Sequence, residues 1–386
     1  MLKLNGMKKL KNLEGGLNNL GVKTAGVRDG KNGLALIVFD KVCEADGVYT
    51  NNKIVSASIK ITRKRIKNGV QAIVINSGNA NCSTGEQGLR DAEGIAWKVA
   101  EELRIDENNI VVASTGIIGR YMDTTLIKNQ IERAVRILGD NSEDAAKAIM
   151  TTDTRPKELC IDFGEFKIGG IAKGAGMIHP NMATMLCFIV TDAKFKKGDL
   201  KKAVDGSFNM MSVDNDMSTN DMVLLVSTGE KTAGNFAEAL TIFCQEMAGM
   251  IIADGEGVTT LIEIEVTGAK NKEDAKLVAR AIADSCLVKT SVFGNNPNWG
   301  RVAAAAGRSG AELEEDKLKI WYEVGGQRYL LFDGFAQDFD RETLSEEMKK
   351  AEKIRIIVEL GLGRGSAKAW SGDMSYEYIK INAEYT

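Results

Sequence analysis

Short apolar runs alternate with segments of helical periodicity along the whole chain, and this alternation limits the fold more than any other feature. Eight runs rich in Val, Ile and Leu have the length of strands: 34–39, 72–76, 110–113, 185–191, 222–227, 261–266, 318–324 and 354–360. Longer segments with helical spacing are predicted to be helices: 91–103, 125–138, 200–210, 236–251, 274–287 and 341–352, with 143–149 as a shorter candidate. Strands interleaved with helices predict an α/β fold in which helices cover sheets.

The length and composition are those of a large globular protein. With 386 residues, 44% of them hydrophobic, the chain exceeds one ordinary domain, and we expect one large domain with a smaller partner or two similar halves. A net charge of −3 gives no basic excess of the kind that binds nucleic acid. No apolar run is long enough to cross a membrane, and the N-terminus lacks the apolar stretch of a signal peptide.

The six cysteines and the single histidine narrow the chemistry. The cysteines are scattered, with no C-x-x-C pair, so we expect no zinc site and a reducing, cytoplasmic setting. His179 is the only histidine, which excludes multi-histidine metal sites. It lies five residues before Thr184 and is interpreted as a loop residue rather than a base. An enzyme with this sequence therefore needs a carboxylate, a lysine or an α-amine as its base.

Thr184 stands where a loop rich in Gly, Pro and Asn meets an apolar strand, within IAKGAGMIHPNMATMLCFIV (171–190). On its own this is the position of an ordinary strand-entry threonine. A cut before Thr184 would instead give this residue a free α-amine, whose pKa of about 7.7–8.0 lets it accept the hydroxyl proton near neutral pH. The cut itself can be autocatalytic, with the Thr184 hydroxyl attacking the Ala183 carbonyl.

The region around this junction resembles the cleavage region of the glutamate N-acetyltransferase (ornithine acetyltransferase) family, which splits at an Ala-Thr bond and uses the new terminal threonine as nucleophile. Further segments resemble the family in the family's order: DGVYTNNKIVSA (46–57), NSGNANCSTGEQG (76–88), VASTGIIG (112–119), MTTDTRPKE (150–158), SVDNDMSTND (212–221), DGEGVTT (254–260), FGNNPNWGRV (293–302) and YIKINAEYT (378–386). Together these segments run nearly from end to end.

The resemblance implies roles for individual residues. Thr184 matches the nucleophile and Ala183-Thr184 the scissile bond, while Thr115 and Gly116 match the pair that stabilises the oxyanion. Substrate-binding positions of the family match the following residues: Thr151, Lys173, Thr184, Glu256, Asn382 and Thr386. The spacing from Asn382 to Thr386 is one residue shorter than the family pattern.

The resemblance also implies a fold, an assembly and an activity. The fold would be a layered α-β-β-α sandwich like that of N-terminal-nucleophile hydrolases, with a smaller C-terminal α/β lobe. Residues 1–183 would form an α chain and 184–386 a β chain, pairing as α2β2. The activity would transfer acetyl from N2-acetylornithine to glutamate in arginine biosynthesis, without metal or redox cofactor. Some family members also accept acetyl-CoA, and no residue here decides between the two types.

Departures from the family and other readings remain open at this point. Asn215 stands where the family has glycine, Met217 where it has threonine and Asn296 where it has aspartate. A self-processing aminopeptidase or amidase could use the same nucleophile with water as acceptor, and a binding protein could keep the fold uncut. The motif GLGRG (361–365) is not a dinucleotide site, because its third glycine comes one position early and no clear helix follows.

Overall fold

The structure is a computed structural model that describes residues 10–179 and 185–384. The chain divides into two compact units. The first unit is drawn from Met1–Gly174, Thr184–Val204 and Met217–Met247, and the second from Ala175–Ala183, Asp205–Asp216 and Ala248–Thr386. The first unit contains strands from both sides of the predicted chain boundary at 183/184, and that boundary stays a prediction.

The first unit combines a large sheet with helices on its faces. Its strands are β1 (Lys11–Leu13), β2 (Lys23–Asp29), β3 (Asn32–Tyr49), β4 (Val70–Ser77), β5 (Ile110–Ser114), β6 (Lys157–Asp162), β7 (Lys167–Lys173), β8 (Leu186–Ala193) and β10 (Met222–Lys231). Its helices are α1 (Ala57–Arg65), α2 (Gly85–Leu103), α3 (Thr124–Arg136), α4 (Ser142–Ala148), most of α5 (Asp199–Asp205) and the larger part of α6 (Phe236–Ile252).

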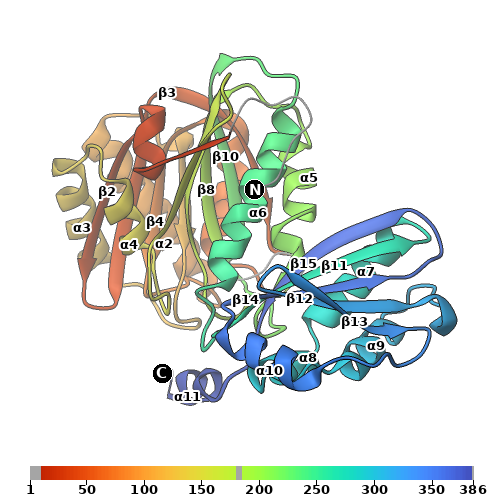
Figure 1. Cartoon of the computed structure of the whole chain (residues 1–386). Coiled ribbons are helices and arrows are strands. Elements are labelled where there is room, and N and C mark those ends of the chain that lie inside the picture. Colours follow the sequence, from red (N-terminus) through yellow and green to blue (C-terminus); the bar gives the residue numbers. More distant parts are fainter. Residues whose placement is uncertain (1–9, 180–184, 385–386) are drawn as a thin grey trace. The chain divides into compact units, whose positions relative to one another are not determined.

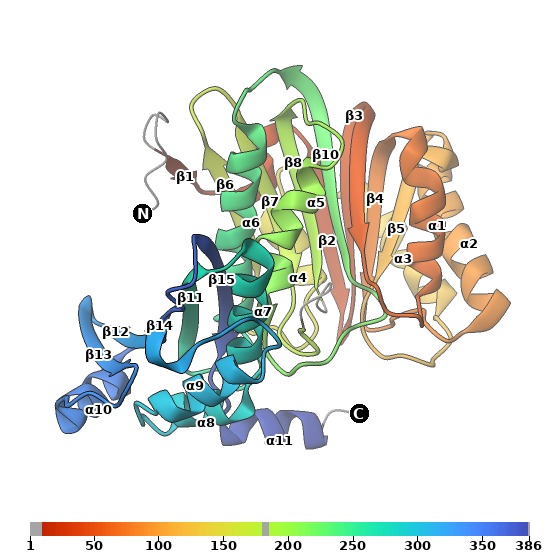
Figure 2. The same ribbon diagram turned by 90° about the vertical axis from the view of Figure 1, so that its right-hand side faces the viewer.

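Strand β3 joins two layers of sheet, because its first half and its second half pair with different strands. Residues 33–38 pair with β4 and, on the other side, residues 32–38 pair with β2, whereas residues 44–49 pair with β10. The register shifts between Val38 and Cys43, where the pairing with β4 is irregular. Among the described strands the order is β1-β6-β7-β8-β10-β3-β4-β5, and Figure 2 shows β8, β10, β3, β4 and β5 in this sequence.

Alternating side chains of the strands build separate cores on the two faces of each layer. Ile73 and Ile75 of β4 belong to one buried cluster with Phe188 of β8 and Leu224 of β10. Val74, from the opposite face of β4, belongs to a second cluster whose remaining members include buried residues of α2 and α3. The order of layers is therefore helices, sheet, sheet and then α6, as Figure 1 shows from α3 through β2 and β8 to α6.

Helix α6 closes the far face of the β8 layer. An added Cβ at Gly170 of β7 would lie 3.1 Å from the ring of Phe243, so glycine allows the helix to approach closely. Cys187 of β8 interacts with Cys244 of the same helix. The expected α-β-β-α sandwich is confirmed in the first unit.

The second unit is a smaller α/β layer, as expected for the C-terminal part. Its strands are β9 (Met211–Ser212), β11 (Leu261–Ala269), β12 (Lys319–Val324), β13 (Gln327–Asp333), β14 (Lys353–Glu359) and β15 (Gly365–Gly372), in the order β13-β12-β14-β11-β15-β9. Its helices are α7 (Lys272–Ala283), α8 (Cys286–Phe293), α9 (Trp299–Gly307), α10 (Arg341–Lys350) and α11 (Tyr376–Glu384). Helix α7 packs on β11 and β15 through residues such as Val278 and Ile282.

Two predicted helices are corrected by the structure. The helix expected over 200–210 ends at Asp205, and a 3₁₀ turn follows over Phe208–Met210. The helix expected over 274–287 is two helices, because the Ser285 side chain caps α8 by accepting a hydrogen bond from the Val288 N–H. The interpretation of GLGRG is confirmed, since strand β15 begins at Gly365 and no helix follows the glycines.

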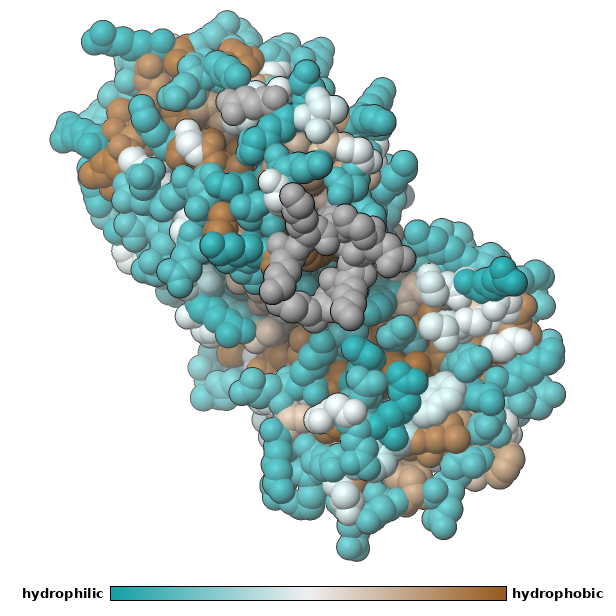
Figure 3. Space-filling view, turned by 45° about the horizontal axis from the view of Figure 1, so that its top comes forward, coloured by the Kyte–Doolittle hydropathy of each residue, from teal (hydrophilic) through white to brown (hydrophobic). Residues whose placement is uncertain are grey.

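The face in Figure 3 is mostly hydrophilic, with apolar residues in small scattered groups. No described helix is both long enough and apolar enough to cross a bilayer.

The core between the two sheet layers predicts a large stability effect at Phe188. This side chain is fully buried, so Phe188→Ala should lower the free energy of unfolding by about 3–5 kcal/mol, through lost transfer energy and a cavity. Ile137→Ala, at a side chain 47% exposed, is the control and should change it by under about 1 kcal/mol. Equal midpoints of urea denaturation for the two variants would contradict this core.

Candidate active site

The candidate site residues divide among three groups. Thr115, Gly116, Thr151 and Lys173 belong to the first unit, and Glu256 and Asn382 belong to the second. The predicted cleavage bond Ala183-Thr184 and the last residue, Thr386, lie outside the described residues.

The turn Thr115-Gly116 follows strand β5 and is held against the loop after β4. The Thr115 N–H donates to the Asn76 carbonyl over 3.0 Å, and bridges join Asn79 to Thr115 and Ile117. Gly116 has φ +130°, and an added Cβ would lie 2.3 Å from the Gly78 carbonyl carbon. Only glycine fits this close approach of two backbone segments.

Two donors of this turn are uncommitted. The Thr115 hydroxyl and the Gly116 N–H make no hydrogen bond to any other residue within 10–179 and 185–384. Thr115 is nevertheless buried, with 5% of its surface exposed. A buried hydroxyl and an adjacent backbone N–H held by a rigid turn are the donors that an oxyanion hole requires.

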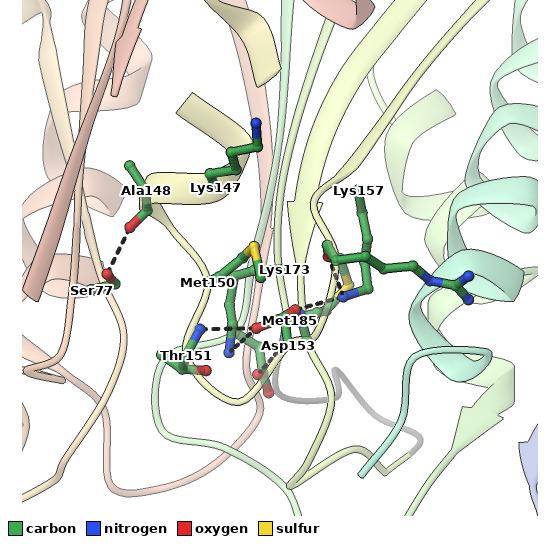
Figure 4. Close-up of polar contacts among 12 residues, drawn as sticks. Ser77, Lys147, Ala148, Met150, Thr151, Asp153, Lys157, Lys173 and Met185 are labelled. Carbon is green, nitrogen blue, oxygen red and sulfur yellow. Dashed lines mark hydrogen bonds and ion pairs between the residues drawn. The ribbon is translucent and has the colours of Figure 1, made fainter. Parts of the chain in front are cut away.

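Lys173 and Thr151 meet around the buried carboxylate of Asp153 (Figure 4). One oxygen, Oδ1, accepts hydrogen bonds from Lys157 Nζ and from the Gly174 N–H, each over 2.7 Å. The other, Oδ2, accepts from the Thr151 N–H over 3.0 Å and lies 3.9 Å from Lys173 Nζ. Asp153 therefore fixes both predicted substrate-binding residues of this unit.

Electrostatics keep this carboxylate charged. Burial alone would raise the pKa of Asp153, but the ammonium groups of Lys173 and Lys157 hold it well below its usual range. Lys157 is 1% exposed and Lys173 is 2% exposed. Both ammonium groups therefore lie beside a buried carboxylate, and Lys173 also acts to lower the pKa of a second one, that of Asp221.

Asp221 lies at the start of β10, beside the beginning of β8. Its Oδ1 accepts a hydrogen bond from the Met185 N–H over 3.1 Å, whereas its buried Oδ2 has no hydrogen-bond partner among the described residues. Complete burial raises the pKa of Asp221 well above its usual range, although the Met185 N–H, Thr50 and Lys173 oppose the rise. Met185 directly follows Thr184, so Asp221 anchors the residue next to the predicted nucleophile.

In the second unit, Glu256 and Asn382 are in direct contact. Asn382 Nδ2 donates to Glu256 Oε2 over 2.8 Å, and the Glu256 N–H donates to the Ala175 carbonyl over the same distance. An added Cβ at Gly176 would come within 2.4 Å of the Glu256 carboxylate, so glycine leaves space for that group. The structure therefore brings together two residues that are 126 positions apart in the sequence.

A second carboxylate accompanies Glu256. Asp214 accepts hydrogen bonds from the N–H groups of Met177 and Ile178, over 2.5 and 2.8 Å. Burial, and to a lesser degree the negative charge of Glu256, raises the pKa of Asp214. The phenol of Tyr378 bonds Asp214, and burial followed by this negative charge raises its pKa as well. This acidic pair suits a cationic substrate group.

His179 has a structural partner. Its Nε2 lies 3.4 Å from Asp284 Oδ2, within the second unit. Burial would raise the pKa of Asp284, but His179 lowers it overall. This pairing agrees with the interpretation of His179 as a loop residue.

Of the three positions that depart from the family, Asn215 has a local explanation. Asn215 has φ +70°, a conformation that glycine favours and asparagine tolerates. Nothing in the structure explains Met217, whose carbonyl accepts a hydrogen bond from Asn52 Nδ2 over 3.0 Å. Asn296 is exposed and accepts from the Asn298 N–H through its backbone over 2.7 Å.

Sequence reasoning missed Asp153, Asp214, Asn220 and Asp221. All four lie inside motifs that were singled out, 150–158 and 212–221, but nothing local distinguished them from solvated loop residues. No group of three or more His, Cys, Asp or Glu residues among the described positions could hold a metal ion.

Comparisons with known proteins agree on one family. The ArgJ family matches residues 19–386. A glutamate N-acetyltransferase from Methanothermobacter thermautotrophicus is 47% identical, over 95% of this chain and 96% of its own length. The arginine biosynthesis bifunctional protein ArgJ of Dehalococcoides mccartyi is 45% identical, over 92% and 91%.

Solved structures show the same similarity. The crystal structure of the arginine biosynthesis bifunctional protein ArgJ from Bacillus halodurans is 38% identical, covers 52% of this chain and 100% of its own, and has a TM-score of 0.48. Ornithine acetyltransferase from Mycobacterium tuberculosis, complexed with ornithine, is 29% identical over 45% and 98%, with a TM-score of 0.41. On the family match and these identities, the chain belongs to the ArgJ family of arginine biosynthesis.

Proposed function

We propose that this protein cuts itself between Ala183 and Thr184 and then transfers acetyl from N2-acetylornithine to glutamate. Membership of the ArgJ family and the names of its relatives support the reaction class. The observation that carries the proposal is the turn Thr115-Gly116, whose hydroxyl and backbone N–H make no hydrogen bond to another described residue. Such donors serve a reaction that passes through a tetrahedral oxyanion.

In the proposed self-cleavage, the Thr184 hydroxyl attacks the Ala183 carbonyl carbon. The peptide C–N bond breaks, its nitrogen takes a proton, and water hydrolyses the resulting ester. The products are an Ala183 carboxylate and a Thr184 residue with a free amine. The antiparallel pairing of β7 with β8, from Ile168 opposite Thr191 to Lys173 opposite Leu186, would keep the two pieces joined after the cut.

In the proposed transfer, the Thr184 hydroxyl attacks the acetyl carbonyl while the Thr184 amine accepts its proton. Thr115 and Gly116 stabilise the oxyanion, the C–N bond breaks, and ornithine leaves with the proton. The amine of glutamate then attacks the acetyl ester, giving N-acetylglutamate and regenerating the hydroxyl. Lys173 would bind the substrate carboxylate, with Thr151 beside it.

Glu256 and Asn382 would bind the cationic end of ornithine, and Thr386 is kept as a further candidate. The proposed assembly is α2β2, in the cytoplasm, where the free thiols of all six cysteines would persist. No metal or redox cofactor enters this cycle. Acetyl-CoA is a second acetyl donor to test, because relatives such as that of Dehalococcoides mccartyi are named bifunctional.

Intact-mass spectrometry tests the cleavage. The purified protein should give fragments 1–183 and 184–386, whereas Thr184→Ala should remain whole at 41.8 kDa because it has no hydroxyl to attack Ala183. Thr184→Ser, which keeps a hydroxyl, is the control and should still be cut. A Thr184→Ala protein that is cut at the same bond would refute autocatalysis.

A transfer assay separates the acetyltransferase from an amidase of the same fold. With acetylornithine labelled in its acetyl group, label should appear in N-acetylglutamate, and turnover should stop without glutamate. Release of free acetate at the same rate without glutamate would instead identify water as the acceptor. Replacing acetylornithine by acetyl-CoA shows whether this second donor is used.

The oxyanion turn predicts the effect of Thr115→Val. This nearly isosteric change removes the hydroxyl donor, so kcat should fall about 10²–10³-fold while KM changes little. Thr115→Ser restores the donor and should recover most of kcat. Thr115→Val with kcat within threefold of the unmodified enzyme would exclude the hydroxyl from the oxyanion hole.

A further inference from the structure

The segment Ser218–Asp221 leads into strand β10 and is buried throughout. Exposed fractions along it are 4% for Ser218, 6% for Thr219, 5% for Asn220 and none for Asp221. Buried polar side chains persist only where they find hydrogen-bond partners. The partners of Asn220 and Asp221 lie in two different parts of the first unit.

Asn220 hydrogen-bonds the backbone on both sides of the turn Thr115-Gly116, called here the oxyanion turn. Its single Nδ2 donates to the Ser114 carbonyl over 2.7 Å and to the Ala80 carbonyl over 2.6 Å. Ser114 directly precedes Thr115, and the Ala80 N–H donates to the Ile117 carbonyl over 3.0 Å. One amide group thus ties together the two backbone segments that shape the turn.

Asp221 holds the start of strand β8. Its Oδ1 accepts from the Met185 N–H over 3.1 Å, and the next residue, Met222, donates its N–H to the Met185 carbonyl over 3.1 Å. Both backbone groups of Met185 are therefore fixed by adjacent residues of one segment. Met185 is bonded covalently to Thr184, the proposed nucleophile.

The segment is itself fixed by the residues before α1. The Thr50 hydroxyl donates to the Ser218 carbonyl over 2.7 Å, and the Thr50 N–H donates to the Asp221 carbonyl over 3.0 Å. The Ser56 N–H donates to the Thr219 carbonyl over 3.1 Å. These bonds make the segment a rigid support on which the other two contacts depend.

From these contacts we infer that Asn220 and Asp221 are positioning residues, which hold the backbone before Thr115 and the backbone of Met185 in the fixed relation that the proposed reaction requires. Asn220 hydrogen-bonds Ser114, the residue before Thr115, and its neighbour Asp221 hydrogen-bonds Met185, the residue after Thr184. The Cα atoms of the adjacent residues Asn220 and Asp221 are about 3.8 Å apart. The two sets of hydrogen bonds that these side chains make can therefore move little relative to one another. The inference rests on the proposed function, because it takes Thr115 and Thr184 as the reacting pair.

Asn220→Ala and Asp221→Ala test this role in the full-length protein. Each variant removes the hydrogen bonds of one positioning side chain and leaves the proposed reacting groups in place. The kcat for acetyl transfer and the rate of self-cleavage should therefore both fall about 10²-fold. KM should stay within threefold of the unmodified enzyme. Asp221→Asn keeps an oxygen acceptor for the Met185 N–H and should retain kcat within tenfold.

Thr191→Val is the matched control for simple destabilisation. Thr191 is fully buried at the other end of β8, where its hydroxyl donates to the Lys167 carbonyl over 2.8 Å. This variant should lose thermal stability but keep kcat. If it loses as much kcat as Asn220→Ala at an equal drop in Tm, the positioning role is refuted.

Three further outcomes are decisive. Folded Asn220→Ala and Asp221→Ala with kcat within threefold of the unmodified enzyme would overturn the inference and leave the proposed function intact. If both alanine variants fail to fold, Thr50→Val tests the positioning role instead. A tenfold loss of kcat in this variant would support the role, and an unchanged kcat would refute it. Failure of the proposed function itself looks different, because the unmodified protein would then neither cut nor transfer.

Discussion

The pairing of β8 between β7 and β10 is the constraint on which the rest of the first unit depends. Seven of the eight residues of β8 are buried, and the strand has a partner on each edge. Phe188 faces the inner core, whereas Cys187 faces α6. A strand fixed in this way cannot shift along its neighbours, so the residue that precedes it has a defined place only once the sheet has formed.

Buried polar groups convert this rigid frame into a specific arrangement. Asp153 orients Lys173 and the Thr151 backbone, while Asp221 fixes Met185. Removing one member of such a cluster leaves buried groups unpaired and costs more than an exposed ion pair is worth. The pKa values of the two carboxyl groups shift in opposite directions, because cations lower the pKa of Asp153 and burial raises that of Asp221.

The sequence was sufficient for the class of fold, for identifiable reasons. Strands such as β4 and β8 are continuous apolar runs, which the sequence alone shows. Strands β6 and β7 escaped prediction because charged and glycine residues interrupt their apolar pattern. The contacts of Asn220 could not be foreseen, because its partner Ser114 is 106 residues away.

The only histidine of the chain is already paired, so the proposed cut would supply the base that the reaction needs. His179 is paired with Asp284, and the buried carboxylate of Asp153 already balances two lysines. An α-amine at Thr184 would supply a base with a pKa near neutrality at the position where the hydroxyl needs it. In this scheme the base forms only after β8 has been fixed by its neighbours, because self-cleavage needs the same aligned hydroxyl. Folding would thus precede activity, and an incompletely folded chain would carry no reactive nucleophile.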